Sequence, residues 1–351
     1  MASLACAAVA PKHIFGAGKA DFDETSAVFL SDIHISGDSK KAIADSFRSV
    51  IAEILRLNPL PRHVFIMGDI SFDVGRRIDY EKARSELKLL ADAGIVVTMA
   101  MGNHDHRKAF FECWPEYEKR SLVKDEVLTV TSLPDYDMII LDSLNETGGP
   151  GKHNIASGRV SKISQQWISE NLPKWPRPFF IGAHHPPSHI LFDGKMGGLT
   201  AKIAEFPRCR GFINGHTHVW LHKKMEFGNG RTVSNLTLPS GTYWGDIGYV
   251  NFKIEKDSYY DSLYIKDDIY ITMKKEETHN LISHIKLEKK EDYQTDDRVG
   301  TNYIYLDETL IKEVPIYAKK ISTNNKKNSS HYSIFYSWNI NNNLIHRSLW
   351  F

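Results

Sequence analysis

Cysteine is scarce in this chain of 351 residues, which holds only Cys6, Cys113 and Cys209. Three cysteines so far apart exclude a disulfide framework and a zinc site built from thiolates. No run of about 18 apolar residues occurs, so the sequence predicts no transmembrane segment. Net charge is nearly absent too, because 44 Lys and Arg residues face 43 Asp and Glu residues, a balance of +1. Bulk charge therefore gives no reason to expect a nucleic-acid polymer as a partner.

Glycine, proline and alanine nearly vanish from about the last hundred residues. Beyond residue 251, Gly300, Pro315 and Ala318 are the sole examples of their types, and Lys, Asn, Tyr, Ile and Ser dominate. We interpret this change as a boundary between a main domain at 25–255 and an extension at 256–351. The extension is expected to be a small β unit, a partner-binding tail or a poorly ordered segment. Within it, residues 268–273 and 302–306 have the pattern of strands, and residues 323–330 have that of a loose polar segment.

Residues 1–24 precede the first predicted strand and include a short stretch of small apolar residues at 4–10. Ala8, Val9 and Ala10 resemble a signal-peptidase site, yet no basic residue precedes them. Two interpretations stay open: the remnant of an export signal, or a loose N-terminus. The compartment is therefore undecided, with the cytoplasm as the default.

Short apolar runs bounded by turn residues predict buried strands at 27–30, 63–67, 95–100, 138–141, 179–182 and 211–214. Apolar residues at helical spacing lie between several of these runs, at 40–57, 80–91 and 161–172. Alternation of strands and helices indicates an α/β core.

Five of the predicted strands run directly into acidic, amide or imidazole side chains. These residues are Asp32 and His34, then Asp69, then Asn103 with His104 and Asp105, then His184 with His185, and finally His216 with His218. In open α/β sheets, ligands bind outside the carboxyl ends of the strands. We therefore expect the five strand ends to converge on one site.

The converging side chains predict a metal centre with two cations. Seven residues are candidate ligands, all with oxygen or nitrogen donors: Asp32, His34, Asp69, Asn103, His184, His216 and His218. Imidazole with carboxylate suits Mn, Fe, Zn, Co or Ni better than Ca or Mg. Seven ligands exceed the three or so of a catalytic zinc and suit two divalent cations about 3.5–4 Å apart that share a carboxylate. Each fragment alone is ordinary turn chemistry, but all five after strands in this order are not expected by chance.

The ordered set resembles the calcineurin-like metallophosphoesterase superfamily over about residues 25–255. The blocks that carry the resemblance are Asp32-x-His34, Gly68-Asp69, Gly102-Asn103-His104-Asp105, His184-x-Pro186 and Gly215-His216-x-His218. The resemblance implies a two-sheet α/β/β/α sandwich flanked by helices. It assigns Asp32, His34, Asp69 and His218 to the first cation, and Asp69, Asn103, His184 and His216 to the second. His104 then faces the substrate phosphate and can protonate the leaving oxygen.

Departures from the family pattern limit which metal centre and which ligands are expected. Purple acid phosphatases have Tyr three residues after the bridging Asp, whereas this chain has Phe72, so a tyrosinate-bound ferric centre is not expected. Asp73 lies one residue beyond a position that is acidic in many members, and we assign it no role. The His-x-Pro register favours His184 over His185 as the ligand.

Finer features resemble the class III cyclic-nucleotide phosphodiesterases. Residues 102–107 lead into Phe110, Phe111 and Trp114, and residues 184–187 read His-His-Pro-Pro. Two further features remain open. Arg107 either reaches a phosphate or is plainly exposed, and Tyr243 and Trp244 either wall a substrate cleft or belong to the core.

We expect a phosphoric ester hydrolase, first of all a phosphodiesterase that acts on a small phosphodiester such as a cyclic nucleotide. A hydroxide bridging the two cations would attack phosphorus, with His104 as the general acid and Asp105 or another carboxylate fixing its tautomer. The alternatives are a phosphomonoesterase or phosphoprotein phosphatase, and a non-catalytic metal-binding scaffold whose C-terminal segment recruits a partner. The native metals and the oligomeric state stay open.

Overall fold

A computed structural model describes residues 21–38, 41–242, 244–256, 263–264, 281–288, 293–306, 309–318, 332–340 and 343–350. The apolar segment at 4–10, the predicted strand at 268–273 and the polar segment at 323–330 lie outside these residues. Within them, no helix is long and apolar enough to cross a membrane.

The first of two large sheets has the order β19-β18-β13-β1-β2-β3. Its strands are β1 (Phe22–Leu30), β2 (Leu60–Ile66), β3 (Val96–Met99), β13 (Val250–Lys256), β18 (Tyr332–Ile340) and β19 (Asn343–Trp350). Strands β1, β2 and β3 run parallel, and β13 pairs with β1 in the antiparallel sense. The carboxyl ends of β1, β2 and β3 therefore lie along one edge of the sheet.

The second large sheet has the order β11-β12-β10-β7-β5-β4. Its strands are β4 (Thr129–Ser132), β5 (Asp137–Ile140), β7 (Phe179–Gly182), β10 (Cys209–Asn214), β11 (Leu221–Glu226) and β12 (Thr232–Thr237). The four inner strands are parallel, and the two edge strands are antiparallel to their neighbours. All six strands predicted from apolar runs are present, whereas the polar edge strand β11 had no apolar signal.

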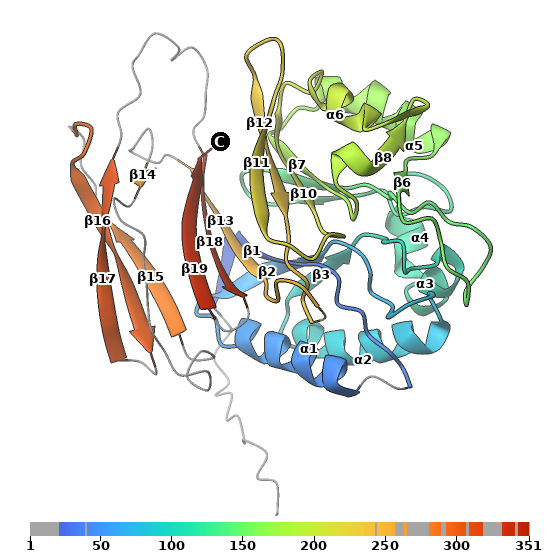
Figure 1. The fold of residues 1–351 in the computed structure, drawn as a ribbon, viewed down its shortest axis with the longest axis horizontal. Helices are drawn as coiled ribbons and strands as arrows, with labels where there is room; N and C mark the ends of the chain where they lie inside the picture. The colour runs from blue at the N-terminus through green and yellow to red at the C-terminus, as the bar shows by residue number, and fades with distance from the viewer. Residues whose placement is uncertain are drawn as a thin grey trace, which may run out of the picture.

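Helices cover the outer faces of the two sheets. They are α1 (Lys41–Ile54), α2 (Arg77–Asp92), α3 (Arg107–Cys113), α4 (Glu116–Arg120), α5 (Lys162–Asn171) and α6 (Gly198–Ile203), with short 3₁₀ turns at Leu172–Lys174 and Pro187–His189. Figure 1 shows α1 and α2 beside the first sheet, and α5 and α6 beside the second. Helix α5 begins where the Ser161 hydroxyl accepts a hydrogen bond from the Ser164 N–H, which caps the first turn.

Alternation along the second sheet separates two hydrophobic layers. Met138 and Phe180 pack into the core shared with the first sheet. Their neighbours Ile139 and Ile181 point to the opposite side, where they pack with Ile168 of α5. Successive strand residues face opposite sides of a sheet, so this two-residue period builds both layers at once. The result is the predicted α/β/β/α sandwich.

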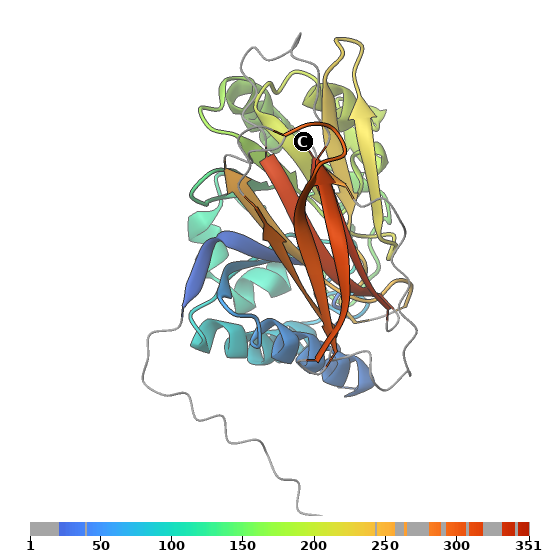
Figure 2. The same cartoon turned by 90° about the vertical axis from the view of Figure 1, so that its left-hand side faces the viewer.

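Two smaller sheets complete the described chain. One comprises β6 (Gly158–Arg159), β8 (Ile190–Phe192) and β9 (Lys195–Met196). The other comprises β14 (Leu263–Tyr264), β15 (Leu281–Leu287), β16 (Arg298–Leu306) and β17 (Thr309–Ala318). Figures 1 and 2 show the second of these sheets alongside β18 and β19. The strand predicted at 302–306 lies within β16.

The C-terminal segment contributes to the main sandwich as well as to its own sheet. Strand β13 extends to Lys256, and β18 pairs with it, from Lys253 opposite Phe335 to Lys256 opposite Tyr332. The first sheet thus continues across the boundary expected at 255. The division of the chain into 25–255 and 256–351 stays a prediction.

Candidate metal centre

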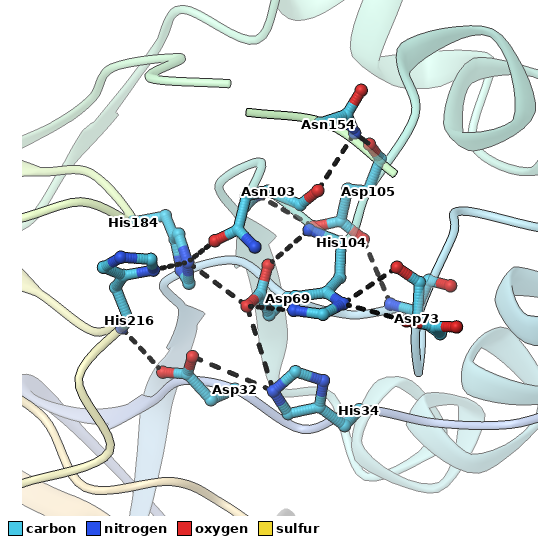
Figure 3. Close-up of polar contacts among 12 residues, drawn as sticks. Asp32, His34, Asp69, Asp73, Asn103, His104, Asp105, Asn154, His184 and His216 are labelled. Atoms are coloured by element: carbon cyan, nitrogen blue, oxygen red, sulfur yellow. Dashed lines mark hydrogen bonds and ion pairs between the residues drawn. The ribbon is translucent and has the colours of Figure 1, made fainter. Parts of the chain in front are cut away.

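The loops that follow five parallel strands meet between the two large sheets (Figure 3). Strands β1, β2 and β3 of the first sheet supply Asp32, His34, Asp69, Asn103 and His104; strands β7 and β10 of the second supply His184, His216 and His218. All seven candidate ligands therefore approach one another, although they come from stretches as far apart as residues 32 and 218. Their joint position follows from parallel strands that end on the same side.

One half of the centre is formed by Asp32, His34 and His218. The Oδ1 atom of Asp32 lies 3.1 Å from Nε2 of His218 and 4.0 Å from Nε2 of His34. The two Nε2 atoms are 3.3 Å apart. Asp69 reaches this group from the adjacent loop, with Oδ2 3.8 Å from Nε2 of His34.

The other half is formed by Asn103, His184 and His216, and it shares Asp69. Nε2 of His184 lies 3.3 Å from Oδ2 of Asp69. The same nitrogen is 3.2 Å from Oδ1 of Asn103 and 3.2 Å from Nδ1 of His216. One carboxylate oxygen of Asp69 thus faces both halves, which is the arrangement that a bridging ligand requires.

Backbone carbonyls fix which nitrogen of each imidazole points into the centre. Nδ1 of His34 lies 3.1 Å from the Phe72 carbonyl, Nδ1 of His184 2.8 Å from that of Met67, and Nδ1 of His218 3.0 Å from that of Trp244. A carbonyl oxygen only accepts, so Nδ1 carries a proton in each ring. In the neutral rings Nε2 is then a lone-pair donor, and these lone pairs converge. Carbonyls that orient imidazoles in this way are the usual second layer around a metal.

The donor set fits divalent cations. Oδ1 of Asp32 is buried, and Nε2 of His218, 3.1 Å away, can donate to it only when the imidazole is charged. Oδ2 of Asp32 accepts one from the His216 N–H at 3.0 Å. A buried carboxylate oxygen without a hydrogen bond is costly unless a cation lies beside it. Oxygen and imidazole donors without thiolate suit the transition metals expected from the sequence.

The pKa values of Asp69 and His184 also favour binding of cations in the centre. Burial raises the pKa of Asp69, but the neighbouring His184 outweighs burial and holds that pKa well below its ordinary value. Burial lowers the pKa of His184, but Asp69 and Asp32 reverse the effect and raise it to about 9. A proton on His184 thus balances the buried carboxylates, and bound cations would displace it.

The loops hold several of these residues in left-handed backbone conformations. The φ angles are 53° at Asp32, 44° at His34, 50° at Asp69, 73° at His216 and 55° at His218. Each costs about 1–2 kcal/mol for a residue other than glycine. Such strain persists where the surrounding structure fixes it, and it gathers at functional sites.

Two glycines allow the loops to come this close. A Cβ atom on Gly102 would overlap Oδ1 of Asp69, and one on Gly215 would overlap Oδ2 of Asp32 as well as the Ser31 hydroxyl oxygen. Any side chain at either position would push a candidate ligand aside. The glycines of the Gly-Asn-His-Asp and Gly-His-x-His blocks are therefore steric requirements of the centre.

His104 stands at the rim, half-buried, beside the shared carboxylate. Its side chain is 31% exposed, and its Nε2 lies 4.0 Å from Oδ2 of Asp69. Its Nδ1 is 2.8 Å from the Asp73 carbonyl oxygen. Asp73, to which sequence reasoning gave no role, therefore orients His104 through its backbone, and side-chain type alone gave no signal of this.

Asp105 does not have the position expected for a residue that sets the tautomer of His104. Its buried carboxylate accepts hydrogen bonds from the backbone N–H groups of Ile70, Ser71 and Gly102 and from the Tyr80 hydroxyl. Burial and the nearby Asp69 raise the pKa of Asp105 to about 6 despite these bonds. Asp105 ties the Asp69 loop to the Asn103 turn, and the Asp73 carbonyl is the group that meets Nδ1 of His104.

Nδ1 of His185 and the guanidinium of Arg107 both bind groups outside the two sets of candidate ligands. Nδ1 of His185 lies 2.8 Å from the Ser143 hydroxyl oxygen. Its ring meets that of His184 edge to face and that of His216 at a tilt, both at centroid distances of 4.8 Å. Arg107 donates to both oxygens of the buried Asp142 carboxylate, at 2.9 and 2.8 Å. The guanidinium is thus engaged in a structural ion pair. Arg107 is neither plainly exposed nor available to a phosphate in this arrangement.

Trp244 borders the first half of the centre, while Tyr243 lies outside the described residues. The indole of Trp244 is 60% exposed. Its ring lies over the His218 imidazole, with centroids 4.4 Å apart and planes 31° apart. The position of this exposed indole beside a candidate ligand offers a surface to a bound molecule.

Comparisons with known proteins agree with the geometry. The sequence model described as "Calcineurin-like phosphoesterase" matches residues 26–220, more than half of the chain. A second model, "Penicillin-binding protein 5, C-terminal domain", matches residues 247–322.

Two curated relatives carry the name "Probable cyclic nucleotide phosphodiesterase". The protein from Rhodococcus erythropolis is 27% identical over 206 residues, which cover 54% of this chain and 64% of the relative. The protein from Rhodopseudomonas palustris is 26% identical over 166 residues, which cover 46% of this chain and 57% of the relative. The chain thus matches less than two thirds of the length of either relative. The resemblance predicted from the five motif blocks is confirmed, and the chain belongs to the calcineurin-like phosphoesterase family.

Proposed function

We propose that this protein is a metal-dependent phosphodiesterase that hydrolyses a small phosphodiester, with cyclic nucleotides as the leading substrate class. The observation that carries the proposal is the pair of ligand groups around one shared carboxylate, Asp69, into which the Nε2 lone pairs of His34, His184 and His218 converge.

The two groups of ligands would each hold one divalent cation. Asp32, His34, Asp69 and His218 would bind the first, and Asp69, Asn103, His184 and His216 the second. When bound, such cations supply Lewis acidity toward phosphate oxygens and make a water molecule more acidic. The family membership of the chain supports this assignment.

His104 would supply the proton that the leaving group needs. Hydrolysis forms a bond from a water oxygen to phosphorus and breaks the bond from phosphorus to the ester oxygen, which must gain a proton. Because the Asp73 carbonyl occupies Nδ1, proton exchange with the substrate is confined to Nε2, at the open side of the ring. A positioned acid of this kind contributes about 10²–10⁴-fold in rate.

Two observations favour a nucleotide diester. Both curated relatives are named as probable cyclic nucleotide phosphodiesterases. In addition, the exposed indole of Trp244 offers an aromatic face beside the first ligand group, on which a base can stack.

A substrate panel on Mn²⁺-loaded full-length protein tests the proposal. The panel contains a chromogenic phosphodiester, the matching monoester, cyclic nucleotides and a glycerophosphodiester. We expect faster turnover of diesters than of the monoester, and hydrolysis of at least one cyclic nucleotide. Preferred hydrolysis of the monoester would establish a phosphomonoesterase instead, and metal binding without hydrolysis of any member would establish a scaffold.

A further inference from the structure

The side chain of Asn154 holds the turn that carries Asn103 and His104. Its Nδ2 atom donates to the carbonyl oxygen of Asn103 at 3.0 Å and to that of Asp105 at 2.8 Å (Figure 3). Its Oδ1 atom accepts from the Thr147 N–H at 2.9 Å. Both partners of Nδ2 are acceptors and the partner of Oδ1 is a donor, so only one orientation of the amide satisfies all three bonds.

These hydrogen bonds fix the backbone of the turn on both sides of His104. The carbonyls of Asn103 and Asp105 belong to the residues that flank His104, so fixing them fixes the backbone from which its imidazole projects. The backbone N–H of His104 itself donates to Oδ1 of Asp69 at 2.9 Å. The turn is thus held by the shared carboxylate on one side and by the Asn154 amide on the other.

Asn154 sits on a loop that is anchored independently of any cation. We name residues 142–155 the clasp loop. The Glu146 carboxylate lies 2.8 Å from Nδ1 of His106 and binds the Arg107 guanidinium at 2.9 Å. The Lys152 carbonyl lies 2.7 Å from Nε2 of His106. The amide of Asn154 is therefore held in place before anything binds in the centre.

The clasp loop is also fastened to the loop that carries Asp69. The backbone N–H of Gly151 donates to the Val74 carbonyl at 2.7 Å. One loop thus spans the two segments that supply the shared carboxylate and the Asn103 turn. Displacing it would disturb the second ligand group and the general acid together.

We infer that Asn154 is a positioning residue, whose carboxamide sets the affinity of the second ligand group for a divalent cation and the placement of the His104 imidazole. The inference rests on the proposed function, since it concerns the same centre. Residues that orient metal ligands typically change metal affinity or activity by about 10–100-fold when they are replaced.

Two substitutions separate positioning by hydrogen bonds from simple filling of space. In Asn154→Asp, the side chain keeps its shape, but a carboxylate oxygen replaces the donor and faces two carbonyl oxygens. In Asn154→Ala, the donor is lost without that repulsion. Positioning predicts that the Asp variant is the more impaired, whereas filling of space predicts that the Asp variant matches the wild type and the Ala variant is worse.

The test is a Mn²⁺ titration of chelator-treated full-length protein, followed by kinetics on a chromogenic phosphodiester. One of the two Mn²⁺ binding steps, called here the second step because it belongs to the second ligand group, should weaken about 10–100-fold in Asn154→Asp. The other step should change little, and kcat should fall more than KM rises. Asn171→Asp is a matched control, because its Nδ2 donates to the Trp167 carbonyl at 2.8 Å near the end of α5. That control should keep wild-type Mn²⁺ affinities and kcat.

The possible results separate the inference about Asn154 from the proposed function. Wild-type affinity in the second step together with wild-type kcat in Asn154→Asp would overturn the inference, and so would an Ala variant more impaired than a folded Asp variant. If the Asp variant does not fold, as judged by circular dichroism, the Ala variant decides alone: a weaker second step supports the inference and an unchanged one overturns it. A wild-type protein that binds no Mn²⁺ would instead overturn the proposed function.

Discussion

Replacing Asp69 by Asn should abolish binding of both cations while leaving the fold intact. The substitution keeps the volume of the side chain and an oxygen that can accept from the His104 N–H, but it removes the charge shared by the two ligand groups. Oδ2 of Asp69 lies 3.3 Å from Nε2 of His184 and 3.8 Å from Nε2 of His34. A cation held by these atoms would lie within about 4 Å of the carboxylate.

The size of the effect follows from that distance. Two unit charges 4 Å apart interact by about 4 kcal/mol at an effective dielectric constant of 20. Loss of the Asp69 charge should therefore weaken the binding of each cation by at least about 10³-fold. Saturating Mn²⁺ at about 100 times its Kd stabilises a protein by about 2.7 kcal/mol for each site, and Asp69→Asn should lose this gain.

The assay combines elemental analysis of Mn²⁺-loaded protein with thermal unfolding at increasing Mn²⁺. Asp137→Asn is the matched control, since Asp137 is a buried carboxylate in β5 that pairs with Arg177 at 2.6 Å, away from the centre. The control should lose stability yet keep its metal content and its Mn²⁺-dependent rise in Tm. An Asp69→Asn protein that retains wild-type metal content and the full rise in Tm would refute the shared-carboxylate reasoning.

Three further predictions test separate parts of the account. Replacing His104 by Ala should keep the metal content and lower kcat for a phosphodiester by about 10²–10⁴-fold; a near wild-type kcat at saturating Mn²⁺ would remove the general acid from the account. Replacing Trp244 by Ala should lower kcat/KM for a cyclic nucleotide about 5- to 150-fold, because stacking on a base contributes about 1–3 kcal/mol, with little change for a glycerophosphodiester; equal losses on both substrates would argue against stacking. Burial raises the pKa of Glu53 on α1 to about 7 despite the nearby Arg56. The folded state therefore binds the Glu53 proton more tightly than the unfolded state does, and the protein loses stability as pH rises from about 4.5 to 7. Glu53→Gln should therefore exceed the wild type by about 1–2 kcal/mol in urea unfolding at pH 8 and equal it at pH 4, and parallel curves at both pH values would contradict the burial argument.

The candidate ligands were accessible to sequence reasoning because strand ends and side-chain chemistry are both local features. Asp32, Asp69 and His184 each follow a short apolar run, and parallel strands bring such ends to one edge. Burial on both faces made these runs continuously apolar and easy to recognise. The same reasoning placed the helices α1, α2 and α5 to within a few residues.

Contacts between residues that lie far apart in the chain could not be predicted from the sequence. The carbonyls of Phe72, Asp73 and Trp244 orient imidazoles through backbone atoms, which leave no trace in residue type. The hydrogen-bond partners of Asp105 were unforeseen for the same reason, because the N–H groups of Ile70 and Ser71 lie about 35 residues away in sequence.

The edges of the two sheets were missed for a related reason. Strand β11 is largely exposed, so it lacks the apolar run that marks an inner strand. Strand β18 returns to pair with β13 from about 80 residues further along the chain. Glycine, proline and alanine content changes near residue 251, but composition does not say which sheet a later strand joins.

The most direct test of the central claim is a chelation and restoration experiment on the purified chain, with phosphodiester hydrolysis measured against added Mn²⁺. We expect exhaustive chelation to reduce hydrolysis to background and about two equivalents of Mn²⁺ to restore it. Full activity in protein that elemental analysis shows to be free of metal would contradict the account.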